Sequence, residues 1–263
     1  MPSLSTASRL DFALHHVDAP PCKCCGGNTN PFGTADFNRT CEDHKAPVFA
    51  RAEVPVPYHR CLACGFIFTV AFDHFTSEDF HRVIYNAEYV YADPDFAERR
   101  PRHNAEMLAR DVLGRHVGAS VLDYGGGNGL LARGLRELGY NRAKTFDPFY
   151  VGSTRPAGTF DLVTAFEVLE HSPTPYETLK EMRWFINDRG MMMFSTLLQP
   201  PEIDTIGLSW WYASPRNGHV SLFSRASLDA LMKRLGLTWG SHNGLLHVAF
   251  RRRPPRFAEH MFR

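Results

Sequence analysis

The stretch VLDYGGGNGLLARGL, residues 121–135, limits the possible folds of this 263-residue chain more than any other part of it. A short apolar run ends at four glycines among five residues, and the residues that follow have the apolar spacing of an amphipathic helix. The glycines allow the backbone to approach a ligand closely, and the helix N-terminus offers unpaired N–H groups. Because α/β proteins bind ligands where a strand passes into such a helix, the stretch predicts a nucleotide-like ligand at the carboxyl edge of a parallel sheet.

The rest of the C-terminal part alternates between helical and strand patterns. Helices are expected over residues 103–116, 129–140, 175–188 and 224–237, and strands over 119–125, 143–147, 160–170 and 189–196, with two more within 238–250. This alternation predicts the α/β class, with a doubly wound, mainly parallel, Rossmann-like sheet covered on both faces. Short helices and a linker are expected over 68–101. The chain is therefore expected to divide into an N-terminal module with linker helices over 1–100 and a larger domain over 101–263.

All six cysteines lie in the first quarter of the chain. Four of them form two C-x-x-C pairs, Cys22 with Cys25 and Cys61 with Cys64, and a glycine follows each pair. Two such pairs supply the four thiolates of a tetrahedral zinc site, and glycine suits the tight turn of a zinc knuckle. A disulfide framework would need an oxidising compartment instead. The sequence therefore predicts a structural zinc ion in a small N-terminal module.

The zinc ligand set stays open at this stage because three other candidates lie nearby. Cys24 adjoins the first pair, and Cys41 with His44 in CEDH offers a substitute ligand pair.

The net charge and the length of the apolar runs argue against nucleic acid and membranes as partners. The formal net charge is +1, so no extended basic surface for nucleic acid is expected, and the basic C-terminal RRRPPR is interpreted as a solvated end. No apolar run approaches the roughly 20 residues that span a bilayer, and the first residues lack a signal-peptide pattern. A cytoplasmic protein that contacts neither membrane nor nucleic acid is expected. Its oligomeric state stays open.

The spacing of the glycines narrows the choice of nucleotide. GGGNG does not fit G-x-G-x-x-G, because Leu130 stands at the last position, and no G-K-[ST] follows. Asp147 ends the second expected strand, twenty residues after Gly127, where its carboxylate is expected to accept hydrogen bonds from ribose hydroxyls. An adenosine-type ligand is therefore favoured over a dinucleotide. A nicotinamide oxidoreductase and a glycine turn without a ligand remain the alternatives.

Residues 103–250 resemble the class I S-adenosylmethionine-dependent methyltransferases, through VLDYGGGNG, TFDPF, FDLVTAFEVLEH, GMMMFST and GHVSLFSRASLDALMKRLGL in that order. The resemblance implies that Asp147 binds the cofactor ribose, and that Phe166 and Glu167 lie beside the cofactor and face the substrate. The residues implied around its methionine part are Asp123, Gly125, Gly127 and Asn128. Only 13 residues separate Asp147 from Asp161, so the family's adenine-contacting acid has no counterpart here.

The N-terminal module has a separate resemblance. Its two C-x-x-C pairs and the following GFIF are similar to the cysteine-rich domain ahead of the core in some sugar-modifying methyltransferases, including deoxysugar C-methyltransferases. This resemblance implies a small polar acceptor, a sugar or a nucleotide-linked sugar, and a place for the module on the substrate side. Whether oxygen, carbon or nitrogen accepts the methyl group stays open.

Candidate catalytic residues come from two segments. In EVLEH a helical turn is expected to bring Glu167, Glu170 and His171 to one face, and the segment 210–224 adds Tyr212 and His219. Either histidine can act as a base near neutral pH, and each also has a purely structural interpretation. The adjacent pair Trp210 and Trp211 is expected either to stack on a substrate or to pack in the core.

Two further hypotheses remain. The run E-x-x-E-H is similar to that of methyltransferases that bind a divalent metal, such as certain quinol and small-RNA O-methyltransferases, and His219 would then be a further ligand. The RNA version is disfavoured by the near-neutral charge. The other hypothesis is a non-catalytic scaffold that contains zinc and a vestigial cofactor pocket.

Overall fold

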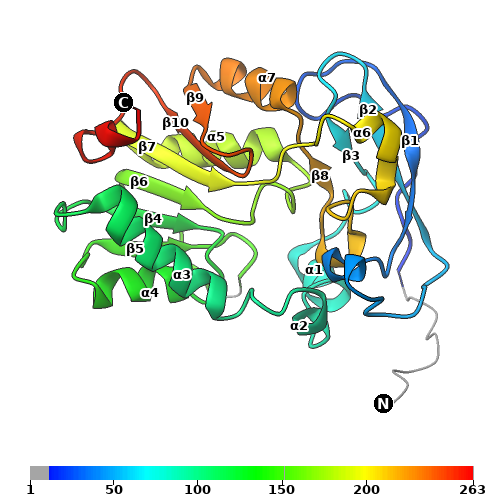
Figure 1. The fold of residues 1–263 in the computed structure, drawn as a ribbon, viewed down its shortest axis with the longest axis horizontal. Helices are drawn as coiled ribbons and strands as arrows, with labels where there is room; N and C mark the ends of the chain where they lie inside the picture. Colours follow the sequence, from blue (N-terminus) through cyan, green and yellow to red (C-terminus); the bar gives the residue numbers. More distant parts are fainter. Residues whose placement is uncertain (1–11, 151, 263) are drawn as a thin grey trace. The chain divides into compact units, whose positions relative to one another are not determined.

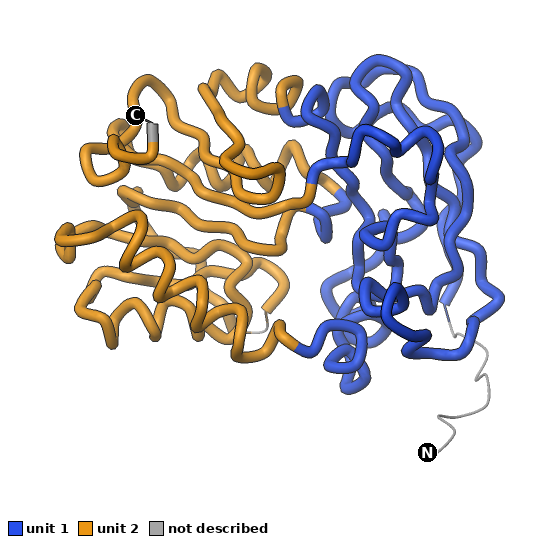
Figure 2. The backbone as a smooth tube through the Cα atoms, in the orientation of Figure 1, with its two compact units in different colours: residues 1–94, 170–173, 198–228 blue, residues 95–169, 174–197, 229–263 orange. Residues whose placement is uncertain are grey.

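The computed structural model describes residues 12–150 and 152–262, and these form two compact units (Figure 2). Unit 1 contains the residues up to Pro94 together with 170–173 and 198–228, and unit 2 contains 95–169, 174–197 and the residues from Asp229 onward. That residues 1–100 and 101–263 fold as two domains stays a prediction. The compact units differ from this division, because two segments of the C-terminal part cluster with the N-terminal residues.

Unit 2 contains a six-stranded sheet with the strand order β5-β4-β6-β7-β10-β9 (Figure 1). Its first four neighbours run parallel, and β10 pairs antiparallel with both β7 and β9. The strands are β4 (Val121–Tyr124), β5 (Ala143–Phe146), β6 (Phe160–Ala165), β7 (Ile186–Ser195), β9 (Thr238–Ser241) and β10 (Leu246–Phe250). The expected α/β class with a mainly parallel Rossmann-like sheet is confirmed.

Helices cover both faces of this sheet. On one face lie α3 (Arg99–Met107), which continues as a π-helical turn over Leu108–Leu113, and α4 (Leu130–Glu137). On the other face lies α5 (Pro175–Phe185), whose Phe185 ring contacts the rings of Phe146 and Phe160 on β5 and β6. Helix α7 (Arg225–Leu235) also forms where the apolar spacing predicts it.

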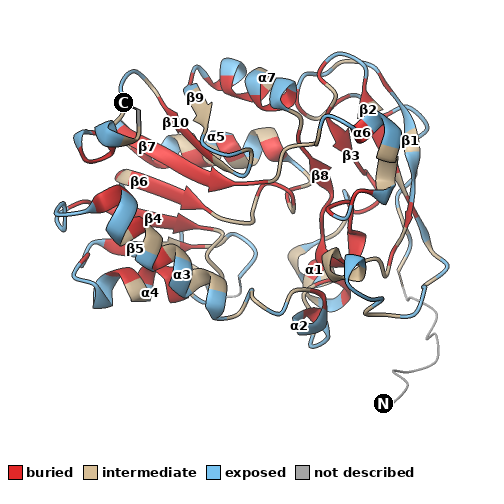
Figure 3. Cartoon of the chain, in the orientation of Figure 1, coloured by how far each residue is buried: buried red, intermediate tan, exposed pale blue. Residues whose placement is uncertain are grey.

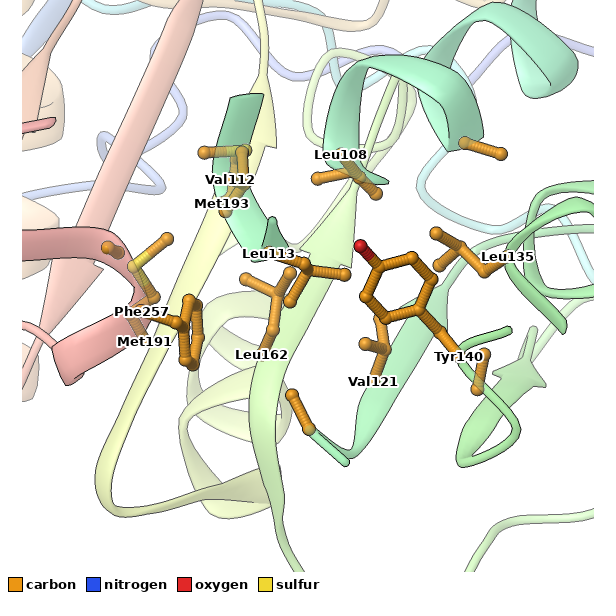
Figure 4. Packing of buried hydrophobic residues seen from close by; sticks show 14 of the residues in the cluster. Leu108, Val112, Leu113, Val121, Leu135, Tyr140, Leu162, Met191, Met193 and Phe257 are labelled. Carbon is orange, nitrogen blue, oxygen red and sulfur yellow. The ribbon is translucent and has the colours of Figure 1, made fainter. Parts of the chain in front are cut away.

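The core beneath α3 and α4 follows from the alternation of side chains along each strand. Val121 on β4 and Leu162 on β6 point to this face and are fully buried against Leu113 and Leu135 (Figure 4). Figure 3 shows the central strands almost entirely buried, as expected for a sheet that helices cover on both faces. This burial fixes the register of the sheet, and with it the position of every strand end.

Unit 1 contains a four-stranded antiparallel sheet in the order β1-β2-β3-β8. Its strands are β1 (Thr29–Asp36), β2 (Pro55–Cys61), β3 (Ile67–Phe68) and β8 (Ser221–Leu222). Sequence patterns did not predict this sheet, and β8 comes from a segment assigned to the C-terminal domain. It pairs with β3 over two residues, Ile67 with Leu222 and Phe68 with Ser221.

Short helices complete unit 1, and two of them lie within 68–101, where short helices were expected. They are α1 (Ser77–Val83), α2 (Tyr89–Ala92), α6 (Ile203–Ile206) and the 3₁₀ turns Cys41–His44, Gly207–Ser209 and Pro215–Asn217. In the part of the chain that the structure describes, none of the helices has the length and apolar character needed to cross a membrane.

Candidate functional site

The glycine turn after β4 adopts a backbone that other residues disfavour. Gly125, Gly127 and Gly129 have φ values of 71°, 50° and 76°, in the left-handed region. A Cβ on Gly125 would lie 2.5 Å from Cγ2 of Val168, and one on Gly126 would overlap the carboxylate of Asp123. By contrast, a Cβ on Gly127 would have no neighbour within 4 Å. The turn is therefore packed on its inner side and open at Gly127.

Asp147 lies beside this turn at the end of β5. Its Oδ2 accepts the N–H of Gly127 at 2.9 Å, its Oδ1 accepts the N–H of Phe149 at 2.8 Å, and its own N–H donates to Oγ of Ser153. A carboxylate oxygen has two lone pairs, so each of these oxygens can accept another hydrogen bond. This geometry suits hydrogen bonds from ribose hydroxyls to the Asp147 carboxylate, and that contact stays a prediction.

Asp123 is 3% exposed and carries a buried carboxylate oxygen at the base of the turn. Its Oδ1 lies 3.4 Å from Oγ1 of Thr164, while Oδ2 has no hydrogen-bond partner among the described residues. Burial raises the pKa of Asp123 to about 7. The hydrogen bond with the Thr164 hydroxyl acts against this rise, and the negative charge of Asp147 adds to it. An unsatisfied buried carboxylate of this kind favours a nearby cation or hydrogen-bond donor.

The other cofactor candidates occupy the same edge of unit 2. Asn128 uses its Oδ1 to accept the N–H of Leu130 at 3.2 Å, so it also supports the start of α4. Phe166 is half-buried and packs against the core beneath α3 and α4. Glu167 follows β6 with φ of +55°, and its N–H and its Oε1 both contact the hydroxyl of Ser195. Ser195 is a residue that the sequence analysis missed, because a serine at a strand end has no distinctive pattern.

The expected helical turn over 167–171 is wrong. The described backbone over 166–171 forms bends and a turn rather than a helix, because Glu167 is left-handed and cannot continue a right-handed helical turn. Glu167 belongs to unit 2, whereas Glu170 and His171 belong to unit 1.

Within unit 1, Glu170 and His171 instead come together with His219. One ligand atom from each of the three lies within 4.8 Å of the others, and Glu170 is fully buried. The rings of His171 and His219 are 4.9 Å apart between centroids. The long separation in sequence between residues 171 and 219 explains why spacing alone did not predict this grouping.

Tyr212 contacts two members of this group. Its hydroxyl donates to Oε1 of Glu170, and its carbonyl oxygen lies 2.8 Å from Nδ1 of His219. Because a carbonyl only accepts hydrogen bonds, Nδ1 of His219 carries the proton, and in the neutral ring the lone pair is then on Nε2. Of the neighbouring tryptophans, Trp210 is buried and packs on the Tyr212 ring, whereas Trp211 is 42% exposed.

The two C-x-x-C pairs form a second group in unit 1. The sulfurs of Cys22, Cys25, Cys61 and Cys64 all lie within 4.8 Å of one another, with 3.6 Å between Cys22 and Cys64 and 3.5 Å between Cys25 and Cys61. No disulfide joins these four. The donor set and its compactness fit a tetrahedral zinc ion.

The two knuckles repeat the same turn. Gly26 and Gly65 have φ values of 76° and 68°, and each donates its N–H to the carbonyl of the first cysteine of its pair, at 2.8 Å to Cys22 and 3.0 Å to Cys61. The expected glycine conformation is confirmed. Cys41 is not part of this group, since its sulfur lies 3.7 Å from Nδ1 of His219.

Comparison with known proteins gives a consistent result. A family model described as "Methyltransferase domain" matches residues 96–241. The "Ubiquinone biosynthesis O-methyltransferase" of Paraburkholderia xenovorans is 28% identical over 132 residues, which are 40% of this chain and 56% of that protein. The protein of the same name from Chromobacterium violaceum is 30% identical over 128 residues, covering 38% and 55%. The chain thus spans about half the length of the curated relatives it matches.

Among solved structures, an O-methyltransferase family protein from Burkholderia thailandensis has a TM-score of 0.50 and 16% identity. The match covers 69% of this chain and 64% of that one. At this identity the similarity concerns the fold alone.

Proposed function

The chain belongs to the methyltransferase domain family, and we propose that it transfers the methyl group of S-adenosylmethionine to a small polar acceptor. The main support is the carboxyl edge of unit 2, where an open glycine turn, the carboxylate of Asp147 and the buried oxygen of Asp123 lie together. A nicotinamide cofactor is disfavoured because residues 96–241 match the methyltransferase domain family.

The residues at this edge suit the cofactor's chemistry. S-adenosylmethionine carries a sulfonium and an ammonium group, and the unsatisfied Oδ2 of Asp123 favours a cation. Asp123, Gly125, Gly127 and Asn128 would surround the methionine part, and Asp147 would bind the ribose. Phe166 and Glu167 would lie beside the cofactor. When bound, the cofactor supplies an electrophilic methyl group on a sulfur that leaves as a neutral thioether.

For the acceptor we propose a hydroxyl group of a sugar or nucleotide-linked sugar. The sugar rests on the resemblance of the cysteine-rich module, and oxygen is favoured because the matched relatives are named O-methyltransferases. In the transfer, an oxygen–carbon bond would form, the sulfur–carbon bond would break, and the hydroxyl proton would pass to a base. His219 is the better base candidate, because the Tyr212 carbonyl leaves its lone pair on Nε2.

A second candidate is metal-assisted O-methyl transfer. It is favoured by the grouping of Glu170, His171 and His219, whose hydrogen bonds to Tyr212 resemble the outer contacts that orient metal ligands. Such an ion would orient the acceptor and lower the pKa of its hydroxyl. Glu167 is not a member of this group. Full activity of protein that keeps the zinc of its four cysteines but holds no second metal ion would exclude this version.

For the four cysteines we propose a structural zinc ion. All four tetrahedral positions would be taken by protein thiolates, which leaves no position for a substrate. The sulfur distances and the repeated knuckle turns support the proposal.

Calorimetric titration with S-adenosylmethionine, S-adenosylhomocysteine and NAD⁺ tests the central proposal. Micromolar binding of the two sulfur nucleotides alone would support it and would justify a screen of sugar and phenol acceptors. Absence of binding to both would favour the zinc-containing scaffold, and binding of NAD⁺ alone would favour an oxidoreductase.

A further inference from the structure

We propose that Ser195 is a positioning residue that holds Glu167 so that its carboxylate favours the cationic methyl donor over the neutral thioether product. This inference rests on the proposed function. It concerns selectivity between S-adenosylmethionine and S-adenosylhomocysteine, which differ in the positive charge on sulfur.

The strand register brings these two residues together. Strands β6 and β7 are parallel, with Ala165 opposite Phe194, so Glu167 leaves β6 where Ser195 ends β7. The Ser195 hydroxyl accepts the N–H of Glu167 at 2.8 Å and donates to Oε1 of the same residue at 3.0 Å. A single hydroxyl thus holds both the backbone and the carboxylate of Glu167.

Glu167 needs such support because of its backbone conformation. Its φ of +55° is in the left-handed region, which is strained for a non-glycine residue. A strained conformation persists only where surrounding contacts over-determine it. The paired hydrogen bonds from Ser195 are contacts of this kind, and they fix the direction in which the side chain leaves the strand.

Ser195 is itself held rigidly. It is 6% exposed and pairs with Leu246 on β10, on the other side of β7 from β6. The next residue, Thr196, donates its N–H to the carbonyl of Leu245 at 3.0 Å and accepts from Nε2 of His247 at 2.9 Å. The hydroxyl therefore acts from a fixed point on the sheet.

The segment carrying Glu167 also lies against the glycine turn. Val168, the next residue, occupies the space that a Cβ of Gly125 would need. Glu167 is half-buried, so its carboxylate is less screened by water than a surface charge. A carboxylate held at this edge attracts a sulfonium and has no comparable attraction for a neutral thioether.

The test compares dissociation constants for S-adenosylmethionine and S-adenosylhomocysteine, measured by calorimetry on the full chain. Ser195→Ala is expected to reduce the preference for the methyl donor about three- to fivefold, as for a partly screened charge interaction. Ser195→Thr, which keeps the hydroxyl, is expected to restore much of the preference. Glu167→Gln should reduce it as Ser195→Ala does, and the double variant should lose little more.

Ser120→Ala is the matched control. Ser120 is also 6% exposed, and its hydroxyl donates to Oδ2 of Asp161 at 2.6 Å, at the opposite edge of the same sheet. The Ser120→Ala variant loses a comparable serine–carboxylate hydrogen bond and is expected to keep the wild-type preference for S-adenosylmethionine over S-adenosylhomocysteine.

The possible outcomes distinguish failure of the Ser195 inference from failure of the proposed function. An unchanged preference in Ser195→Ala would overturn the inference while leaving the proposed function intact. An equal loss in Ser120→Ala, or additive losses in the double variant, would indicate a general structural effect and would also overturn it. Failure of the wild type to bind either nucleotide would refute the proposed function itself.

Discussion

The hydroxyl of Tyr212 donates a hydrogen bond to the fully buried carboxylate of Glu170, across 42 residues of sequence. Tyr212→Phe removes only this donor, and leaving a buried carboxylate oxygen without it is expected to cost about 1–3 kcal/mol of stability. Urea unfolding would measure this. Tyr91→Phe, on a 54% exposed ring, is the control and should be neutral. Equal stability of the two variants would contradict a role for the bond.

The cysteine group predicts one zinc ion per chain. Cys61→Ser should release the metal and unfold the N-terminal module, because binding of structural zinc contributes directly to folding. Metal content by mass spectrometry and protease resistance would report the two effects. Cys41→Ser should retain the zinc, since the sulfur of Cys41 lies beside His219 instead. A metal-free wild type with an intact module would refute the site.

Asp147 is predicted to bind the cofactor ribose. Asp147→Ala should weaken binding of S-adenosylhomocysteine by about 1.5–3 kcal/mol, as for lost hydrogen bonds to a charged group. Because Asp147 also accepts the N–H of Gly127, part of this loss would come from a looser glycine turn. Asp188→Asn, at a side chain that is 97% exposed, controls for the change in charge. Unchanged affinity would assign the ribose to another residue.

Asp123 predicts a pH effect on both stability and binding. Burial raises the pKa of Asp123 from 3.8 to about 7, so the folded state binds this proton more tightly than the unfolded state. Its contribution to stability is therefore fully present below pH 3.8 and is lost as the pH rises toward 7. Asp123→Asn should remove this dependence and unfold at higher urea concentration than wild type at pH 8.

The same group should couple cofactor binding to proton release. A bound cation favours the carboxylate form, so binding of S-adenosylmethionine at pH 6 is expected to release a proton from Asp123. Titrations in buffers of different ionisation enthalpy would detect this release. Its persistence in Asp123→Asn would show that another group supplies the proton.

Local patterns predicted most of unit 2. The apolar run before the glycines, the helical spacing after them and the alternation down the chain place β4, α4, β5, β6 and α5 close to where they lie. These elements are predictable because each depends on neighbours a few residues away. Each C-x-x-C knuckle was predictable for the same reason, since Gly26 and Gly65 close local turns onto Cys22 and Cys61.

The relationships decided by tertiary structure join residues that are distant in sequence. The sequence by itself determined the strand–glycine–helix unit, the carboxylates at the strand ends and the cysteine spacing, because these are set by steric and hydrogen-bonding preferences of adjacent residues. Only the fold decided that Tyr212 and His219 gather at Glu170, that Ser195 holds Glu167, and that β8 joins the sheet of unit 1. Those contacts follow from burial of apolar faces and from strand register, which depend on the whole chain at once.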